Sequence, residues 1–183
     1  MINLEKLFKT QKLLDKRIVD EHNLHGQDLL PKKILSLQVE LGELCQEWRG
    51  FKFWSKDQEP RTKKYSSDYL VLPDGTEIEK ESNPLLEEYV DGLHFILSIG
   101  NDLNFNLEEW DIEPYHKQSI LYTFNHVYRM VGDFEMAKTD FDFVHIIDSF
   151  LGLGEMLGFT WEQIEQAYYT KNAINHTRQD NLY

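Results

Sequence analysis

Apolar residues recur at helical spacing along most of the chain, and this pattern predicts an all-α fold. Six stretches place apolar residues three or four positions apart, as expected for helices that bury one face. Their predicted ranges are 4–22, 31–49, 84–103, 114–131, 140–157 and 161–178. We therefore expect a helical bundle of about six helices.

Residue types at the ends of these stretches support their boundaries. Pro84 suits a first helical turn, where the missing backbone N–H is not needed, and Ser82 or Asn83 is placed to cap that helix. Thr160 followed by Gln163 forms the capping-box pattern at the start of the last stretch. The capping residues and the apolar periodicity thus indicate the same helix starts.

The helical pattern lapses between residues 51 and 83. Lysine and arginine cluster there, and the segment YLVLPDGTEIE places the turn dipeptide Asp74-Gly75 between two short runs of β-prone residues. This arrangement predicts a small β-hairpin near residues 66–80. We interpret residues 55–83 as an insertion within a single domain that spans residues 1–183.

Two of the predicted helices carry paired carboxylates. Glu40 and Glu43 lie in the segment VELGELCQEWRGFKFW, and Glu88 and Asp91 lie in EEYVDGLHF. Residues three apart share one helix face, with Cβ atoms roughly 5–6 Å apart. If the two helices pack side by side, the pairs form a cage of four carboxylates.

The same spacing is common on solvated helices, so the surrounding residues decide between the two interpretations. The apolar residues that accompany the acids are Ile34, Leu37, Leu41, Leu44 and Trp48 in the first helix and Leu86, Tyr89, Leu93, Ile96 and Leu97 in the second. Because both helices are so apolar, we expect the acids to be partly buried rather than fully solvated.

Partly buried carboxylates that lie together repel one another unless a cation sits among them. Oxygen donors without Cys or His favour a hard ion, so the cage predicts Mg²⁺, with Mn²⁺ as the other candidate. Magnesium in proteins usually keeps waters and binds substrate phosphates as well as carboxylates. A nucleotide polyphosphate is therefore the expected partner of the cage.

The charge of the chain narrows the list of partners. A formal net charge of −13 argues against a protein that binds nucleic acid or an anionic membrane through a basic surface. No apolar run approaches the length of about 18–20 residues that spans a bilayer, and no signal peptide is recognisable. We therefore expect a cytoplasmic protein.

The last predicted helix carries two cations and an amide on one face. Lys171, Asn175 and Arg178 follow one another at positions i, i+4 and i+7. Cations near a helix C-terminus also complement the helix dipole, which is a purely structural explanation. The functional alternative is a polyphosphate clamp, in which Lys171 acts as a point charge and Arg178 as a two-pronged donor.

Three segments together resemble a known family. ELGELCQEWRGFKFW, NPLLEEYVDGLHFILSIG and YYTKNAINHTRQDNLY are similar to the dimeric all-α dUTP pyrophosphatases, within the all-α nucleoside triphosphate pyrophosphohydrolases that include the MazG-like enzymes. The resemblance covers nearly the whole chain. It implies a homodimer that uses Mg²⁺ to hydrolyse dUTP to dUMP and pyrophosphate, and that accepts dUDP as well.

The resemblance also implies roles for single residues. Those that match the metal ligands of the family are Glu40, Glu43, Glu88 and Asp91. Either Glu40 or Glu43 is expected to activate the attacking water as well. The residues that match the phosphate and sugar contacts of the family's tail are Lys171, Asn175 and Arg178.

Further matches concern the base and the sugar. Phe95 matches the aromatic residue against which the deoxyribose packs, and His94 is expected in the same pocket. Gln11 resembles the amide that hydrogen-bonds the uracil edge. The residues that resemble those reaching a nucleotide in the same or the neighbouring subunit are Arg49, Lys52 and Trp54.

Three alternatives remain open at the level of the sequence. A side-chain amide such as that of Gln11 can flip and read either uracil or cytosine, so a dCTP-hydrolysing enzyme is one alternative. A broader MazG-like pyrophosphohydrolase is the second. The third is a non-catalytic helical module that senses nucleotides or binds proteins.

Overall fold

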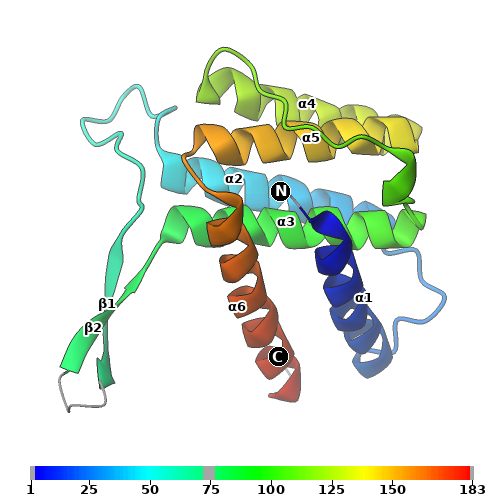
Figure 1. Cartoon of the computed structure of the whole chain (residues 1–183), viewed down its shortest axis with the longest axis horizontal. Helices are drawn as coiled ribbons and strands as arrows, with labels where there is room; N and C mark the ends of the chain where they lie inside the picture. The colour runs from blue at the N-terminus through cyan, green and yellow to red at the C-terminus, as the bar shows by residue number, and fades with distance from the viewer. Residues whose placement is uncertain (1–2, 72–76, 182–183) are drawn as a thin grey trace.

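The computed structural model describes residues 3–71 and 77–181, and in these ranges it contains six α-helices and one β-hairpin (Figure 1). The helices are α1 (Leu4–Glu21), α2 (Leu30–Trp48), α3 (Pro84–Leu103), α4 (Ile120–Ala137), α5 (Asp140–Met156) and α6 (Trp161–Asp180). A short 3-10 helix, η1 (Leu107–Glu109), follows α3. The prediction of an all-α fold with about six helices is confirmed.

Helices α2 and α3 lie side by side at the centre of the bundle (Figure 1). Helices α4 and α5 pack on one side of this pair, and α1 and α6 contact α3 from the other side. Leu37 and Leu41 of α2 and Leu97 of α3 are fully buried. Each such leucine stabilises the fold by about 1.5–3 kcal/mol relative to an exposed one, so the central pair holds the acidic helix faces in place.

The close approach of α3 to α5 depends on a glycine. A Cβ atom on Gly92 would lie 3.0 Å from the Cζ atom of Phe150, which is closer than most such contacts allow. One turn earlier, the ring of Tyr89 stacks on Phe150 at 4.4 Å, and its hydroxyl donates to the Phe150 carbonyl (3.0 Å). This packing fixes the segment of α3 that carries two of the predicted metal ligands.

The predicted helix starts at Asn83 and Thr160 are confirmed. The side chain of Asn83 accepts a hydrogen bond from the backbone N–H of Leu86 (3.1 Å). Thr160 and Gln163 form the reciprocal capping box at the start of α6. These caps satisfy backbone donors that the first helical turn leaves unpaired.

The predicted helix over 114–131 is wrong at its start, because α4 begins at Ile120 and continues to Ala137. The side chain of Ser119 caps α4. The preceding residues run along α5, where the backbone N–H of Tyr115 donates to the Asp148 carbonyl (2.8 Å). A Cβ atom on Gly152 would collide with the Tyr115 carbonyl, so this glycine lets the segment lie against α5.

The predicted hairpin is confirmed, and it extends away from the helices (Figure 1). Strand β1 (Lys64–Val71) pairs antiparallel with β2 (Glu77–Ser82), with an irregularity between Tyr65 and Tyr69. The predicted turn at Asp74-Gly75 lies outside the described residues.

Within the described ranges, no helix alone is long and apolar enough to cross a membrane. Helices α5 and α6 reach the length and apolar composition of a membrane span only when they are taken together, as a pair bent by 109°.

Candidate active site

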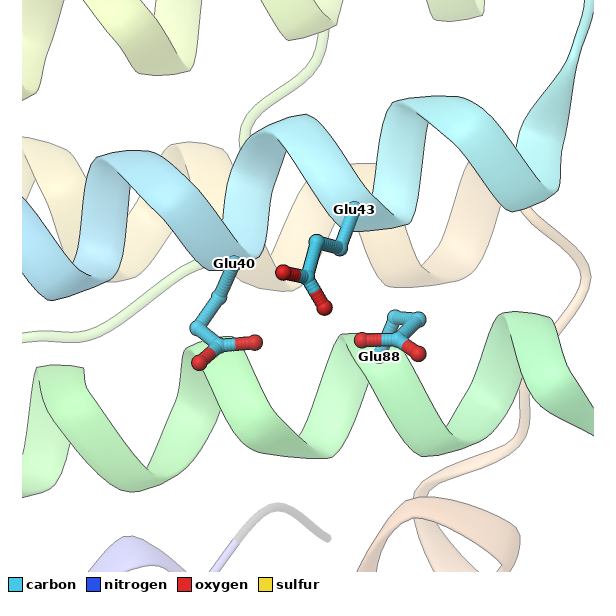
Figure 2. Close-up of side chains that lie close together, drawn as sticks. All are labelled: Glu40, Glu43 and Glu88. Carbon is cyan, nitrogen blue, oxygen red and sulfur yellow. The ribbon is translucent and has the colours of Figure 1, made fainter.

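Three carboxylates from the two central helices meet in one place. Glu40 and Glu43 project from α2 and Glu88 projects from α3, and their carboxylates turn toward one another across the space between the helices (Figure 2). One oxygen from each of the three lies within 4.8 Å of the others. The structure therefore brings together three of the four residues predicted as metal ligands.

Asp91, the fourth predicted ligand, is paired with a cation from the last helix. Its Oδ2 atom lies 2.5 Å from the ammonium of Lys171, and the two side chains are only 17% and 20% exposed. Asp91 is not part of the group of three, although its charge raises the pKa values of Glu40 and Glu88. Asp91 thus lies beside the carboxylate group, with Lys171 as its partner.

The carboxylate group holds its protons more tightly than isolated glutamates do. Burial, together with the charges of Asp91 and Glu43, raises the pKa of Glu40 to about 7. Burial and the charges of the same neighbours and of Glu40 raise the pKa of Glu88 to about 7. A cation bound here would remove this cost of ionisation, and an all-oxygen donor set fits a hard divalent ion.

A cavity of about 400 Å³ opens beside the carboxylates, between α1, α2, α3 and α6. Eight of the residues predicted to hold metal or substrate line it: Gln11, Glu40, Asp91, His94, Phe95, Lys171, Asn175 and Arg178. Its volume is within the range of small-molecule sites. Because Glu40 and Asp91 belong to its wall, a ligand in the cavity would reach the carboxylate group.

Gln11 is buried at the wall of this cavity, with 4% of its surface exposed. Its Nε2 atom donates to Oδ1 of Asp15 (2.8 Å), and its Oε1 atom accepts from the hydroxyl of Tyr168 (3.0 Å). The amide is therefore held at both ends by protein groups.

His94 is buried against the ring of Tyr168, with ring centroids 4.3 Å apart. Burial lowers the pKa of His94 to about 4, so its ring is neutral at physiological pH. Nδ1 lies 2.8 Å from the Val90 carbonyl, which can only accept, so Nδ1 carries the proton. Nε2 is then an acceptor, and no described residue donates to it.

The predicted tail residues all reach the cavity, because α6 is tied to α1. One guanidinium nitrogen of Arg17 donates to the His176 carbonyl (2.9 Å), and another contacts the carboxylate of Asp180. In the first half of α6, the ring of Tyr168 is fully buried. These contacts direct the face of α6 with Lys171 toward the carboxylates.

The structure does not bring Arg49, Lys52 and Trp54 to the cavity of their own chain. Arg49 adopts a left-handed backbone conformation (φ 64°) at the end of α2. Its guanidinium binds the carbonyl (2.8 Å) and the carboxylate (2.9 Å) of Asp57. Lys52 lies over the ring of Phe51, and Trp54 is 66% exposed. A contact with the neighbouring subunit's nucleotide stays a prediction for these three.

The sequence interpretation missed several polar residues of the cavity. Asp15 and Ser98 line it and hydrogen-bond each other (2.9 Å). Lys33 also lines it and pairs with Asp102 (2.7 Å). Helical spacing could have revealed two of them, because Asp15 is four residues after Gln11 and Ser98 is four residues after His94.

Comparison with known proteins identifies the family. The sequence matches the family described as dUTPase over residues 3–71 and 75–183. A search of curated proteins finds no significant match. The matched ranges include the helices that supply the three carboxylates and the lining of the cavity. The chain therefore belongs to the dUTPase family, and the protein is a dUTP diphosphatase, a hydrolase that acts on a nucleoside triphosphate.

Proposed function

We propose that the protein hydrolyses dUTP, and dUDP as well, with Mg²⁺ held by Glu40, Glu43, Glu88 and Asp91. Enzymes of this family are typically metal-dependent. The observation that carries the proposal is the group of three carboxylates, with one oxygen from each within 4.8 Å of the others, beside a cavity of nucleotide size. Manganese, which also accepts oxygen ligands, would fit the same donors.

The carboxylates have two roles in this proposal. Magnesium bound among them would offset the negative charge of the phosphates and lower the pKa of a water molecule. Glu40 and Glu43 lie three residues apart on α2, and either is placed to accept a proton from the attacking water. Glu88 and Asp91, from α3, complete the negative charge that holds the ion.

Lys171, Asn175 and Arg178 bind the phosphates and the sugar in the proposal. All three come from α6 and line the cavity. The chain carries a formal charge of −13, so a polyphosphate needs local cations as well as the metal. The two cations of α6, Lys171 and Arg178, line the cavity beside the carboxylate helices and supply that charge.

Three side chains form the nucleoside pocket in the proposal. Phe95, one helical turn beyond Asp91, packs against the deoxyribose, where a ribose 2′-hydroxyl has no room. His94 lies in the same wall of the cavity and helps to shape the pocket. Gln11 binds the uracil edge with its amide.

We also propose that two copies of the chain form a dimer in which Arg49, Lys52 and Trp54 contact the nucleotide of the neighbouring subunit. Phe53 and Trp54 are 86% and 66% exposed, and neither lines the cavity of its own chain. Sedimentation analysis is expected to give a dimer. A monomer with full activity would contradict this proposal.

The direct test is a comparison of substrates. With Mg²⁺, the purified protein is expected to release pyrophosphate from dUTP and phosphate from dUDP, and to lose both activities in EDTA. Hydrolysis of dCTP, dTTP and UTP should be slower than that of dUTP. The difference should be smallest for dTTP, because its one additional methyl group gives only about 1–3 kcal/mol of discrimination. Equal rates on all four triphosphates would instead favour a broad MazG-like enzyme. Preference for dCTP would favour the cytosine alternative.

The raised pKa values of Glu40 and Glu88 predict how metal-dependent stabilisation changes with pH. Both pKa values, about 7, exceed the ordinary value of 4.5, so between these pH values the folded protein holds protons that the unfolded chain releases. The metal-free protein therefore loses stability as pH rises through this window. Because Mg²⁺ binds the ionised carboxylates, the gain in Tm that it causes should increase from about pH 5 to about pH 8.

Thermal melts with and without saturating Mg²⁺ across this range would measure the gain. The variant Glu88→Gln should show a smaller gain at high pH. Glu87→Gln is the matched control, because it removes an exposed acid next to Glu88 that is not part of the carboxylate group. A gain in Tm that does not change with pH in the wild-type protein would contradict the assignment.

A further inference from the structure

We propose that Asp15 is a positioning residue that fixes the side-chain amide of Gln11 in one orientation, so that the site reads uracil and rejects cytosine. The inference rests on the proposed contact between Gln11 and the base. It assigns a role in substrate selection to a side chain that need not touch the phosphates or the metal.

Asp15 lies at the centre of a hydrogen-bond network between α1, α3 and α6. Its Oδ1 atom accepts from Nε2 of Gln11 (2.8 Å) and from the hydroxyl of Ser98 (2.9 Å). The amide nitrogen of Asn101 lies 3.5 Å from its Oδ2 atom. Burial raises the pKa of Asp15, whereas these hydrogen bonds and the nearby Lys33 ammonium favour the ionised form.

Both carboxylate oxygens of Asp15 accept hydrogen bonds in this network, and this determines which end of the Gln11 amide faces them. The nitrogen must point to Asp15, which leaves the oxygen facing the hydroxyl of Tyr168 at 3.0 Å. A flipped amide would place its oxygen 2.8 Å from Oδ1 of Asp15, with no proton between the two acceptors. The acceptor oxygen of Asp15 therefore excludes the flipped orientation.

The fixed amide still has one donor and one acceptor to offer. Nε2 has a second hydrogen and Oε1 has a second lone pair. Because the amide cannot flip, the donor and the acceptor occupy fixed positions along its edge. Uracil presents an N3–H donor beside a carbonyl acceptor, which match Oε1 and Nε2. Cytosine presents an unprotonated N3 acceptor beside an amino donor, which match only the flipped amide. With the amide fixed, cytosine would place acceptor against acceptor and donor against donor.

The network around Gln11 contains a ready alternative that the acceptor oxygen of Asp15 suppresses. The hydroxyl of Tyr168 also lies 3.4 Å from the Leu7 carbonyl, so it has a second acceptor to which it can donate. If position 15 carried an amide, its N–H could donate to Oε1 of a flipped Gln11. The Tyr168 hydroxyl would then donate to Leu7 and accept from Nε2. Both orientations of Gln11 would become possible.

The variant Asp15→Asn tests this inference. The ratio of kcat/KM for dCTP to kcat/KM for dUTP should rise by at least about 100-fold, because hydrogen-bond readout of this kind discriminates strongly. A merely structural role for Asp15 would lower both values together and leave the ratio unchanged. An unchanged ratio would therefore overturn the inference.

Asp20→Asn is the matched control. It makes the same chemical change on α1, in an exposed residue that pairs with Lys16 on the same helix and does not line the cavity. It should leave the ratio at the wild-type value. If the wild-type protein does not hydrolyse dUTP at all, the proposed function fails, which is a different result from an unchanged ratio in the variant.

The wild-type protein offers a second test that does not depend on the folding of a variant. A neutron crystal structure after deuterium exchange would show which atom of the Gln11 amide carries deuterium. Deuterium on the atom that faces Asp15 supports the inference. Deuterium on the atom that faces Tyr168 would overturn it.

Discussion

Replacing Glu43 by glutamine is expected to reduce dUTP turnover by at least about 1,000-fold and to leave the metal-free protein as stable as the wild type or more stable. Glutamine has nearly the same shape but carries no charge to hold the metal and cannot take a proton from water. Glu43 is exposed at the surface of α2, so its removal disturbs little packing. The substitution is therefore expected to reduce turnover without lowering the stability of the metal-free protein.

The stability effect follows from the geometry of the carboxylates. An oxygen of Glu43 lies within 4.8 Å of oxygens of Glu40 and Glu88, and the charge of Glu43 raises the pKa values of both. Removing that charge relieves repulsion in the folded state. In EDTA the variant should melt at the wild-type temperature or above it. In saturating Mg²⁺ the order should reverse, because the wild-type protein binds the ion more tightly.

Single-turnover kinetics and thermal melts in both conditions would measure these effects. Glu87→Gln, which removes an exposed acid outside the carboxylate group, should retain wild-type turnover and the wild-type response to Mg²⁺. If Glu43→Gln hydrolysed dUTP at the wild-type rate, the carboxylate group would not be the catalytic site.

The carboxylate group of the candidate site could be predicted in part because helical spacing determines which side chains share a face. Glu40 and Glu43 are three residues apart on one helix, and the apolar residues before, between and after them place that helix in the core. The same reasoning applies to Glu88 on α3. Helical spacing depends only on neighbours in the sequence. The structure confirms that the carboxylates of Glu40, Glu43 and Glu88 lie close together.

The partner of Asp91 depended on contacts that no local pattern reveals. Lys171 is 80 residues away in the sequence, and it meets Asp91 only because α6 packs across α3. Similarly, Arg49 turns to Asp57 because the chain takes a left-handed conformation at the end of α2. Long-range packing and backbone turns of this kind decide where flexible cations point.

The helix predicted over 114–131 shows a limit of apolar periodicity. The sequence pattern predicts that Pro114 belongs to a helix, because apolar residues follow it at suitable spacing. An extended segment that packs on a helix can have similar spacing, and only contacts such as that between Tyr115 and Asp148 distinguish the two. The direction of the hydrogen bonds around Gln11 could not be predicted from the sequence either, because residue spacing predicts which side chains lie close together but not which atom donates.

Replacing Lys171 by methionine is expected to lower kcat/KM for dUTP by about 100- to 1,000-fold. Methionine keeps an unbranched apolar stem but removes the charge that lines the cavity. In the proposed function this charge stabilises the phosphates as they react. Lys16→Met is the matched control, because Lys16 is exposed and pairs only with Asp20 on the same helix face among the described residues. Wild-type kcat/KM in Lys171→Met would contradict a phosphate-binding role.

The same substitution should also destabilise the metal-free protein, because it leaves Asp91 mostly buried without its closest cation. Burial raises the pKa of Asp91 above its ordinary value of 3.8, and Lys171 opposes that rise. In Lys171→Met the pKa should rise further, so stability should fall more steeply as pH increases above about 4. Adding Asp91→Asn should restore Tm in EDTA, since the unpaired charge is gone, but should not restore turnover. Recovery of both by the double variant would mean that Lys171 serves only to neutralise Asp91.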